Sequence, residues 1–278
     1  MKKRSDRDKP SVIGTVIFII VLLAVAAPFY VMFVGAVKPN ISLIKMPVEF
    51  SPFRNLTTQN INTVFEKSDI FQWLKNSFIL SVSVAAITAF IGVTAGYAFA
   101  KIDFKGKNFF FMLVMATLMM PKQMLLIPNY LVAYSLNLQD TMIGLILTSI
   151  APAFGVFLSR QLITTLPTTL FEAAEIDGCS EPGKFFRVAL PLSLPAMGTI
   201  AIFAFFNTFN DYIWQLVMIS KKSLRTLPVG MSFFAEQMLN NRAVQLAVAA
   251  IATLPMIILF LICQKFFIKG ATAGAVKG

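Results

Sequence analysis

Histidine is absent from this chain, and charged residues make up only 13% of its 278 positions. Without histidine the sequence lacks the commonest metal ligand and a frequent general base, and it predicts no metal site. The two cysteines, Cys179 and Cys263, are too few to form the disulfide framework of a small secreted domain. Soluble proteins carry about 25% charged residues. The sequence therefore excludes both a soluble globular domain and a disulfide scaffold.

Apolar residues take the place of the missing charges. They make up 57% of the chain, including 28 phenylalanines, and the mean hydropathy is +0.75. Long charge-free runs of this composition are typical of an all-α, polytopic membrane protein. The net charge of +11 would hint at nucleic acid in a soluble protein. In a membrane protein, basic residues collect in inner loops and at anionic headgroups, so we expect membrane lipid and no nucleic acid as partners.

Six charge-poor stretches are long enough to cross a bilayer, whose apolar core takes about 20 residues of helix. The sequence predicts a single transmembrane domain over residues 1–278. Its helices are expected at about 11–37, 76–100, 109–132, 141–159, 188–212 and 243–267. Pro121, Lys122 and Pro128 interrupt the third stretch, but membrane helices tolerate proline kinks when neighbours satisfy the freed carbonyls. The first stretch is too long for the core of a signal peptide, so we expect it to be retained.

The distribution of Lys and Arg gives the expected orientation. With the N-terminus in the cytoplasm, the inner segments hold fourteen of these residues and the outer segments hold nine. Both termini are therefore predicted to be cytoplasmic, in a multi-pass protein of the cell membrane. The loop over residues 213–242 is more basic than is usual for an outer loop.

The segment between the fourth and fifth predicted spans, residues 167–187, is too polar to cross the membrane and is expected at its inner face. Thr169 followed by Glu172 matches a capping box, which predicts the start of a short helix. Gly178 can take the left-handed conformation that ends a helix, and Ser180 with Pro182 favours the start of a second one. From this pattern alone, Glu172 either caps a connector or belongs to an interaction surface.

The same segment resembles the EAA loop of the permeases of carbohydrate ABC importers. The residues that carry the resemblance are Glu172-Ala173-Ala174, Asp177-Gly178, Phe185, Leu190-Pro191 and Pro195-Ala196. The similarity extends to Gly96-Tyr97-Ala98-Phe99-Ala100-Lys101, Ile127-Pro128-Asn129-Tyr130, Thr226-Leu227-Pro228-Val229-Gly230 and the tail over 264–278. Within the binding-protein-dependent transport inner membrane component family, the chain is most similar to the smaller membrane subunits of maltose-type transporters. Phe209 and Gln215 depart from that pattern, which has Trp and Pro there.

The resemblance implies a permease subunit of an ATP-driven, binding-protein-dependent sugar importer, with oligosaccharides as the expected cargo. Its partners would be a homologous permease, two ATPase subunits and an extracytoplasmic sugar-binding protein. The expected ATPase contacts are Glu172, Ala173, Ala174, Asp177 and Gly178 in the connector, and Gly274, Lys277 and Gly278 in the tail. The chain has no G-x-x-x-x-G-K-[ST] phosphate loop. We therefore expect it to be no enzyme and to bind no cofactor, with ATP-Mg held by the partner ATPases.

Three polar residues near the outer end of the fifth span, Asn207, Asn210 and Asp211, fall on one helical face. Polar groups inside a membrane are costly and often line a wet pathway, so these residues are candidates for the translocation path. Hydrogen bonds between helices are the other interpretation.

Two other functions compete with the importer. An ion- or proton-coupled secondary transporter commonly carries internal repeats and carboxylates at mid-membrane. Here Asp211 is the only carboxylate inside a predicted span, near its end, and no repeat is apparent. A non-transporting assembly or receptor protein would leave the inner connector unexplained.

Overall fold

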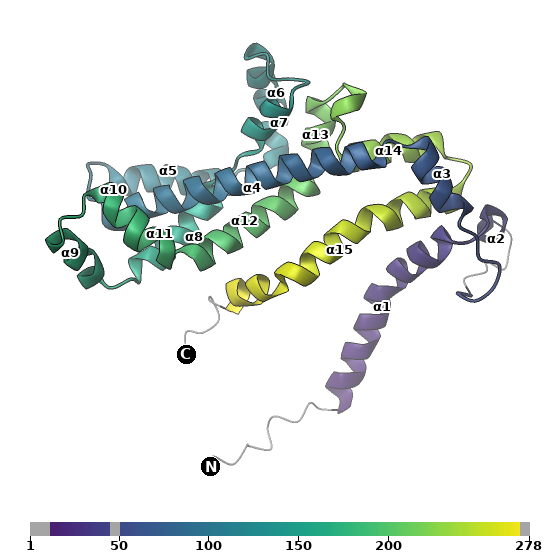
Figure 1. The fold of residues 1–278 in the computed structure, drawn as a ribbon, viewed down its shortest axis with the longest axis horizontal. Helices are drawn as coiled ribbons and strands as arrows, with labels where there is room; N and C mark the ends of the chain where they lie inside the picture. The colour runs from purple at the N-terminus through teal and green to yellow at the C-terminus, as the bar shows by residue number, and fades with distance from the viewer. Residues whose placement is uncertain (1–11, 45–50, 273–278) are drawn as a thin grey trace. The chain divides into compact units, whose positions relative to one another are not determined.

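The structure is a computed structural model that describes residues 12–44 and 51–272. Within these ranges the regular elements are helices and no strand occurs, which confirms the all-α fold class. The α-helices (Figure 1) are α1 (Val12–Ala36), α2 (Asn40–Ile44), α3 (Gln59–Lys67), α4 (Ile70–Lys101), α5 (Lys107–Met119), α6 (Leu126–Ser135), α7 (Met142–Ser149), α8 (Ala153–Thr164), α9 (Thr168–Ile176), α10 (Glu181–Lys184), α11 (Leu190–Leu192), α12 (Leu194–Phe209), α13 (Ile213–Met218), α14 (Leu227–Gln237) and α15 (Arg242–Thr272). Two 3₁₀ segments, η2 (Lys122–Leu125) and η4 (Lys222–Leu224), and a π-helical segment, η3 (Phe185–Ala189), complete the list.

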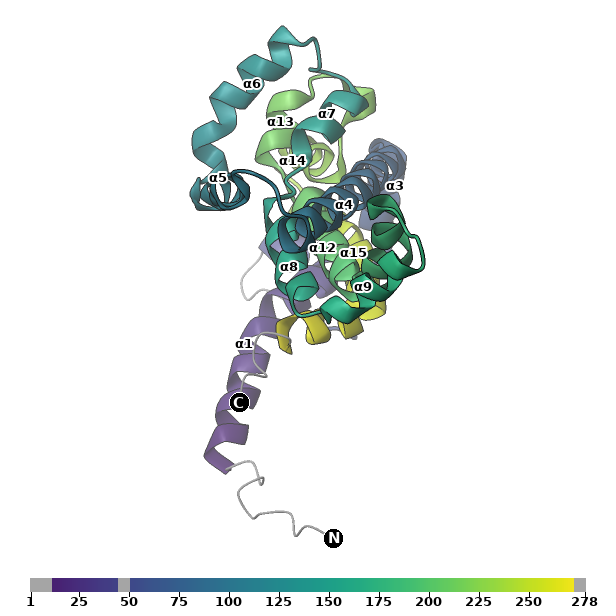
Figure 2. The same cartoon turned by 90° about the vertical axis from the view of Figure 1, so that its left-hand side faces the viewer.

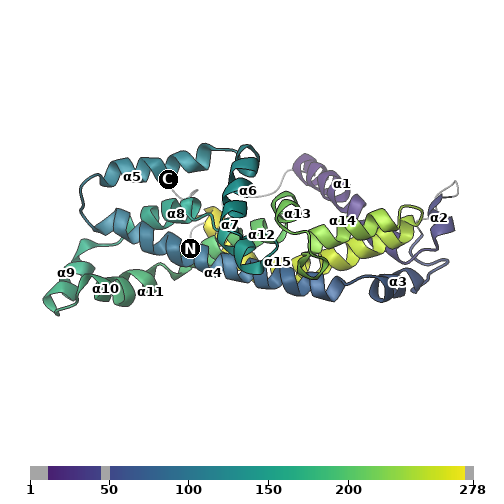
Figure 3. The same ribbon diagram turned by 90° about the horizontal axis from the view of Figure 1, so that it is seen from above.

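Three helices, α1, α4 and α15, are each long and apolar enough to cross a membrane. Three further candidates are helix pairs bent at a short break: by 97° between α5 and the η2–α6 segment, by 48° between α7 and α8, and by 73° between the α10–α11 segment and α12. Figure 3 shows the sharp turn from α5 into α6. The count reaches six if each bent pair is one span, so the predicted number of spans is compatible with the structure and stays a prediction.

Each of the three breaks lies at or near a proline. Pro121 follows α5 closely, Pro152 directly precedes α8, and Pro195 lies at the start of α12. Proline has no amide hydrogen and its ring clashes with the preceding turn, so it ends or kinks a helix. The stretch predicted at 109–132 is therefore two helices at a steep angle rather than one kinked helix.

The described residues fall into two compact units, which are described separately. The first comprises the described residues up to Asp69 together with Met231–Met256, and the second comprises Ile70–Gly230 and the described residues from Ile257 onward. The boundary after Gly230 falls inside α14, and the boundary after Met256 falls inside α15. The single domain over residues 1–278 stays a prediction.

In the first unit, a buried asparagine fixes the chain that follows α1. Asn60 Nδ2 donates to the carbonyl oxygens of Ala36, at 2.9 Å, and Lys38, at 2.7 Å. Gly35 lets α1 approach α15, because a Cβ at this position would lie 2.3 Å from Leu246 Cδ1. These contacts join the end of α1, the loop after it and the first part of α15.

In the second unit, α4 is the helix around which the others pack, chiefly α8 and α12 (Figure 1). Its approach to α8 depends on glycine. A Cβ on Gly92 would lie 3.0 Å from backbone atoms of Gly155, and a Cβ on Gly96 would lie 2.5 Å from Ser159 Cβ. Small residues let membrane helices approach closely, where van der Waals contact drives their association.

Two buried clusters lie along α4. The cluster near its C-terminal end contains Ala89, Val93, Tyr97, Ile163, Phe171, Phe185, Ala189 and Ile200. The cluster nearer its N-terminal end contains Leu80, Val84, Ala133, Leu145, Met218 and Ile219. The second cluster gathers α6, α7 and α13 against α4 (Figure 2). The helix α4 therefore connects α9, at one end, with the segments that follow α12, at the other.

We expect Gly96→Ala to destabilise the protein by about 1–3 kcal/mol, because overpacking a tight helix contact forces backbone shifts. Thermal unfolding in detergent, followed by tryptophan fluorescence, measures the loss. The matched control is Gly183→Ala, since the nearest atom to a Cβ there, Cys179 Cβ, lies at 3.5 Å, an ordinary contact. Equal melting temperatures for the two variants would contradict the close approach of α4 and α8.

Candidate coupling site and membrane cavity

The connector after α8 forms the short helix α9 (Thr168–Ile176). Pro167 precedes it with an extended backbone and occupies the N-cap position, and no side chain caps the helix. The predicted capping box of Thr169 and Glu172 is therefore wrong. The fixed backbone angle of proline starts the helix two residues earlier than that pattern requires. Glu172 thus has no part in starting α9.

Gly178 ends α9 as predicted, with a φ of +77° in the left-handed region. Its amide donates to Glu175 O at 2.9 Å, and the amide of Cys179 donates to Ala174 O at 2.9 Å. These bonds satisfy carbonyls that a helix end otherwise leaves unpaired. A Cβ at Gly178 would meet nothing within 4 Å, so the backbone conformation rather than crowding favours glycine.

The two sides of α9 differ in exposure. Phe171 and Ala174 are buried against the rest of the second unit, so one of the predicted contact residues, Ala174, points inward. We call the exposed residues Glu172, Ala173 and Ile176, together with Asp177 directly after the helix, the outer face of α9. Ile176, which is 87% exposed, was not among the predicted contacts; an isoleucine in a polar connector was the available signal. The predicted tail contacts Gly274, Lys277 and Gly278 lie outside the described residues.

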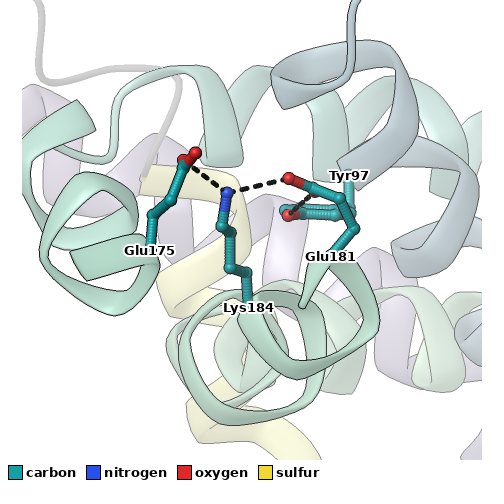
Figure 4. Close-up of polar contacts among 4 residues, drawn as sticks. All are labelled: Tyr97, Glu175, Glu181 and Lys184. Carbon is teal, nitrogen blue, oxygen red and sulfur yellow. Dashed lines mark hydrogen bonds and ion pairs between the residues drawn. The ribbon is translucent and has the colours of Figure 1, made fainter. Parts of the chain in front are cut away.

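A lysine with little exposed surface joins the end of α9 to the next helix, α10, which begins after Ser180 as predicted. Lys184 Nζ donates to Glu175 Oε2 at 2.7 Å and to Glu181 Oε1 at 2.9 Å (Figure 4). Lys184 thus bridges Glu175, near the end of α9, and Glu181, at the start of α10.

The last turns of α4 reach both ends of α9. The Tyr97 hydroxyl donates to Glu181 Oε2 at 3.0 Å (Figure 4). Lys101 Nζ donates to Leu166 O at 2.9 Å and lies 4.8 Å from the centre of the Phe171 ring. The sequence alone does not indicate this network, because Tyr97 and Glu181 are 84 positions apart and no spacing pattern links them.

A cavity of about 310 Å³ lies in the second unit beside α4, α8 and α12. Its polar lining residues are Thr88, Lys122, Ser149, Asn207 and Thr208, and its aromatic ones are Phe154 and Phe203. The Thr88 hydroxyl is buried and has no hydrogen-bond partner among the described residues. The volume is at the lower end of the range of small-molecule sites, about 300–1,000 Å³. The cavity combines aromatic rings with hydroxyl, amide and ammonium groups.

Of the three predicted path residues, Asn207 lines this cavity and the other two do not. Asn210 Nδ2 donates to Phe206 O at 2.8 Å, and Asp211 Oδ1 accepts from Trp214 N at 3.2 Å. Both bonds are local, at the end of α12 and the start of α13. The structure therefore separates Asn207 from the other two, because α12 ends at Phe209.

Gln215, one of the two departures from the expected pattern, is buried next to the cavity wall. Its Nε2 donates to Thr208 O at 2.5 Å, and its Oε1 accepts from the Thr226 hydroxyl. A proline could make neither of these bonds. Gln215 thus joins the end of α12 to the loop before α14.

The chain matches a family model over residues 89–272, which is most of its length and includes the whole of α9. The family comprises the inner membrane components of binding-protein-dependent transport systems. The chain belongs to this family. The resemblance inferred from the connector is confirmed, and the permease is a multi-pass component of the cell membrane.

Permease proteins of several transport systems match this chain over nearly its full length. It is 34% identical to the arabinooligosaccharides transport system permease protein AraQ of Bacillus subtilis, over 95% of each chain. It is 29% identical to the diacetylchitobiose uptake system permease protein DasC of Streptomyces coelicolor, over 99% of this chain and 100% of that one. It is 30% identical to the sn-glycerol-3-phosphate transport system permease protein UgpE of Pectobacterium atrosepticum, over 95% of this chain and 97% of that one.

A solved structure shares the fold. One chain of a bacterial ABC transporter involved in the import of the acidic polysaccharide alginate superimposes with a TM-score of 0.82. The match covers 96% of the permease and 100% of that chain at 22% sequence identity. At this identity the likeness establishes the fold alone.

We expect α9 to unfold locally more often in the Gly178→Val variant than in the Gly178→Asn variant. A β-branched residue is strained at positive φ, whereas asparagine tolerates this conformation. A strain of about 1–2 kcal/mol corresponds to about tenfold faster amide exchange. Hydrogen–deuterium exchange of the α9 amides measures the difference. Equal exchange in the two variants would contradict the left-handed turn at Gly178.

Proposed function

We propose that the permease is the membrane-spanning subunit of an ATP-driven, binding-protein-dependent importer of sugars, with oligosaccharides as its cargo class. It forms the translocation path together with a homologous permease. The observation that carries the proposal is the family match over residues 89–272. The exposed outer face of α9 and the cavity beside α4 supply the two features that such a subunit needs.

The names of the relatives support a carbohydrate cargo. AraQ is named for arabinooligosaccharides and DasC for diacetylchitobiose, which are short sugar chains. The lining of the cavity has the same chemistry, because sugars offer apolar ring faces to aromatic side chains and hydroxyls to polar ones. Phe154 and Phe203, with ring centres 5.6 Å apart, and the amide of Asn207 meet those requirements. Asn207 is thus the path residue in this proposal, and Asn210 and Asp211 shape the end of α12.

The outer face of α9 is the docking surface for an ATPase subunit. Ala173 and Ile176 offer close apolar contact, and Glu172 and Asp177 offer charge-assisted hydrogen bonds to a basic partner. ATP is bound and hydrolysed by two partner subunits, one for each permease. Their closure displaces α9, and rocking of the two permeases as rigid bodies opens the path alternately to each side.

Both termini are cytoplasmic in this proposal, and an extracytoplasmic sugar-binding protein delivers cargo on the opposite side from α9. One membrane domain over residues 1–278 has six spans, namely α1, α4, α15 and the three bent pairs, surrounded by lipid. The tail residues Gly274, Lys277 and Gly278 contact the ATPase subunits, where glycine permits close backbone approach. The excess of Lys and Arg in the inner segments supports the orientation.

The ion- or proton-coupled alternative finds no support in the described residues. Such a carrier commonly has a coupling carboxylate in its path. None of the described residues that line the cavity is acidic. Asp211, the carboxylate considered for that role, is engaged with the start of α13.

We expect an ATPase to co-purify with the permease in stoichiometric amount when the complex is isolated from its native membrane. Glu172→Lys places a positive charge on the docking surface and should reduce the bound ATPase by about tenfold, since an interfacial charge pair is replaced by repulsion. The matched control is Glu66→Lys, at an exposed position on α3, which should leave ATPase binding unchanged. Quantitative gel or mass-spectrometric analysis of the purified complexes provides the ratio.

Two results would contradict this proposal. A wild-type permease that purifies without an ATPase would contradict the proposal that it is a subunit of an ATP-driven importer. A Glu172→Lys permease that binds the ATPase and imports its cargo as the wild type does would move the docking surface away from α9.

The orientation has its own test, by cysteine labelling in right-side-out membrane vesicles. Cys179 and Cys263 are first replaced, and single cysteines are placed at Asn62 and Lys105, both exposed. We expect a membrane-impermeant maleimide to label Asn62→Cys and to leave Lys105→Cys unlabelled. The reverse pattern would place the termini outside.

A further inference from the structure

Two ties hold α9 to α4, one at each end of the short helix. At the start of α9, Lys101 donates to Leu166 O and lies over the Phe171 ring. At its end, Tyr97 is joined to Glu175 through Glu181 and Lys184 (Figure 4). Tyr97 and Lys101 are one helical turn apart and therefore project from the same side of α4.

The second tie crosses the Gly178 turn. Glu175 lies before the turn, and Glu181 and Lys184 lie after it. Glycine leaves the backbone of a turn with more freedom than any other residue, and no other atom would contact a Cβ at Gly178. The side-chain bonds from Lys184 therefore brace a place where the backbone alone resists rotation weakly.

Burial makes this tie different from an ordinary surface ion pair. Exposed pairs contribute little to stability, and the side chains of Glu175 and Glu181 are 71% and 54% exposed. Lys184, however, is only 8% exposed, and Tyr97 only 4%. An ammonium or hydroxyl group with so little access to water is costly unless it is hydrogen-bonded. The bonds to the two carboxylates therefore compensate the Lys184 ammonium for its lost contact with water.

The tie ends inside the packed part of the second unit. The Tyr97 ring lies 6.1 Å from the ring of Phe171 and 5.4 Å from that of Phe185, centre to centre. Further along the same helix, Val84 and Thr88 line the cavity. A displacement of α9 that is passed to Tyr97 thus reaches the cavity through a single helix.

We propose that Lys184 is a positioning residue that makes α9 and α4 move as one body, so that force applied to α9 reaches the cavity. The inference rests on the proposed docking of an ATPase on α9. Without Lys184, α9 turns about Gly178 when the ATPase moves it, and α4 stays behind. ATP is then hydrolysed without opening or closing the path.

The test follows the accessibility of the cavity, which requires no knowledge of the cargo. In a permease lacking Cys179 and Cys263, a single cysteine replaces Asn207 at the cavity lining. The complete complex with its ATPases is reconstituted in lipid vesicles. Labelling by a membrane-impermeant maleimide is measured without nucleotide and after trapping with ATP-Mg and vanadate, and ATP hydrolysis is measured on the same preparation.

Lys184→Met removes both hydrogen bonds and should reduce the nucleotide-dependent change in labelling by about fivefold or more, since the loss of even one hydrogen bond changes a two-state equilibrium by about that factor, while ATP hydrolysis continues. Lys184→Arg keeps the charge and several N–H donors and should restore the response. The matched control is Lys107→Met, because Lys107 also pairs with a carboxylate, that of Asp103 at 3.2 Å, but outside this network. It should behave as the parent does.

If Lys184→Met does not assemble with the ATPases, Tyr97→Phe decides, because it removes only the hydroxyl at the other end of the tie and keeps the ring. It should weaken the response in the same direction. A normal labelling response in the assembled Lys184→Met or Tyr97→Phe complex would overturn the positioning role and leave the proposed function intact. A parent complex without ATPase, or without any nucleotide response at Asn207→Cys, would overturn the proposed function itself.

Discussion

The close approach of α4 to α8 sets the positions of the other functional parts of the second unit. Membrane helices gain little from hiding apolar side chains, because lipid tails are just as apolar, so contact between backbones becomes decisive. The two helices can approach because Gly92, Gly96 and Gly155 have no side chains to keep them apart. With α8 held in this way, Pro167 starts α9 beside the end of α4, and the cavity lies against the same pair of helices. The helix α9 and the cavity thus depend on one packing contact.

Two lysines, Lys101 and Lys184, hold a short helix in place. The helix α9 has only nine residues, too few to be stable without tertiary contacts. Phe171 and Ala174 anchor one side of it, and Lys101 and Lys184 hold its two ends. The opposite side then remains exposed. This arrangement holds α9 firmly, because the apolar anchors resist sliding and the hydrogen bonds resist rotation.

Hydropathy predicted two of the long helices well, since α1 and α15 follow their apolar runs closely. The helix α4 begins earlier than its apolar run, at Ile70, because its polar first turns pack against the loop near Ser223. The motif residues of the connector and the left-handed Gly178 were also predictable, because they depend on local sequence. The proline breaks changed the direction of helices whose apolar runs looked continuous. The tie through Lys184 could not be predicted, because Tyr97 meets Glu181 only after α4, α8 and α9 have packed together.

The central claim, that α9 and α4 move as one body, is tested most directly by a distance within the permease. Spin labels on Thr94 of α4 and Thr168 of α9, both exposed and neither part of the docking surface, allow pulsed electron resonance to measure that distance in the complete complex. The account predicts one narrow distance distribution that stays the same without nucleotide, with ATP and after vanadate trapping. A shift or a broadening of the distribution on ATP binding would contradict it, because α9 would then move independently of α4.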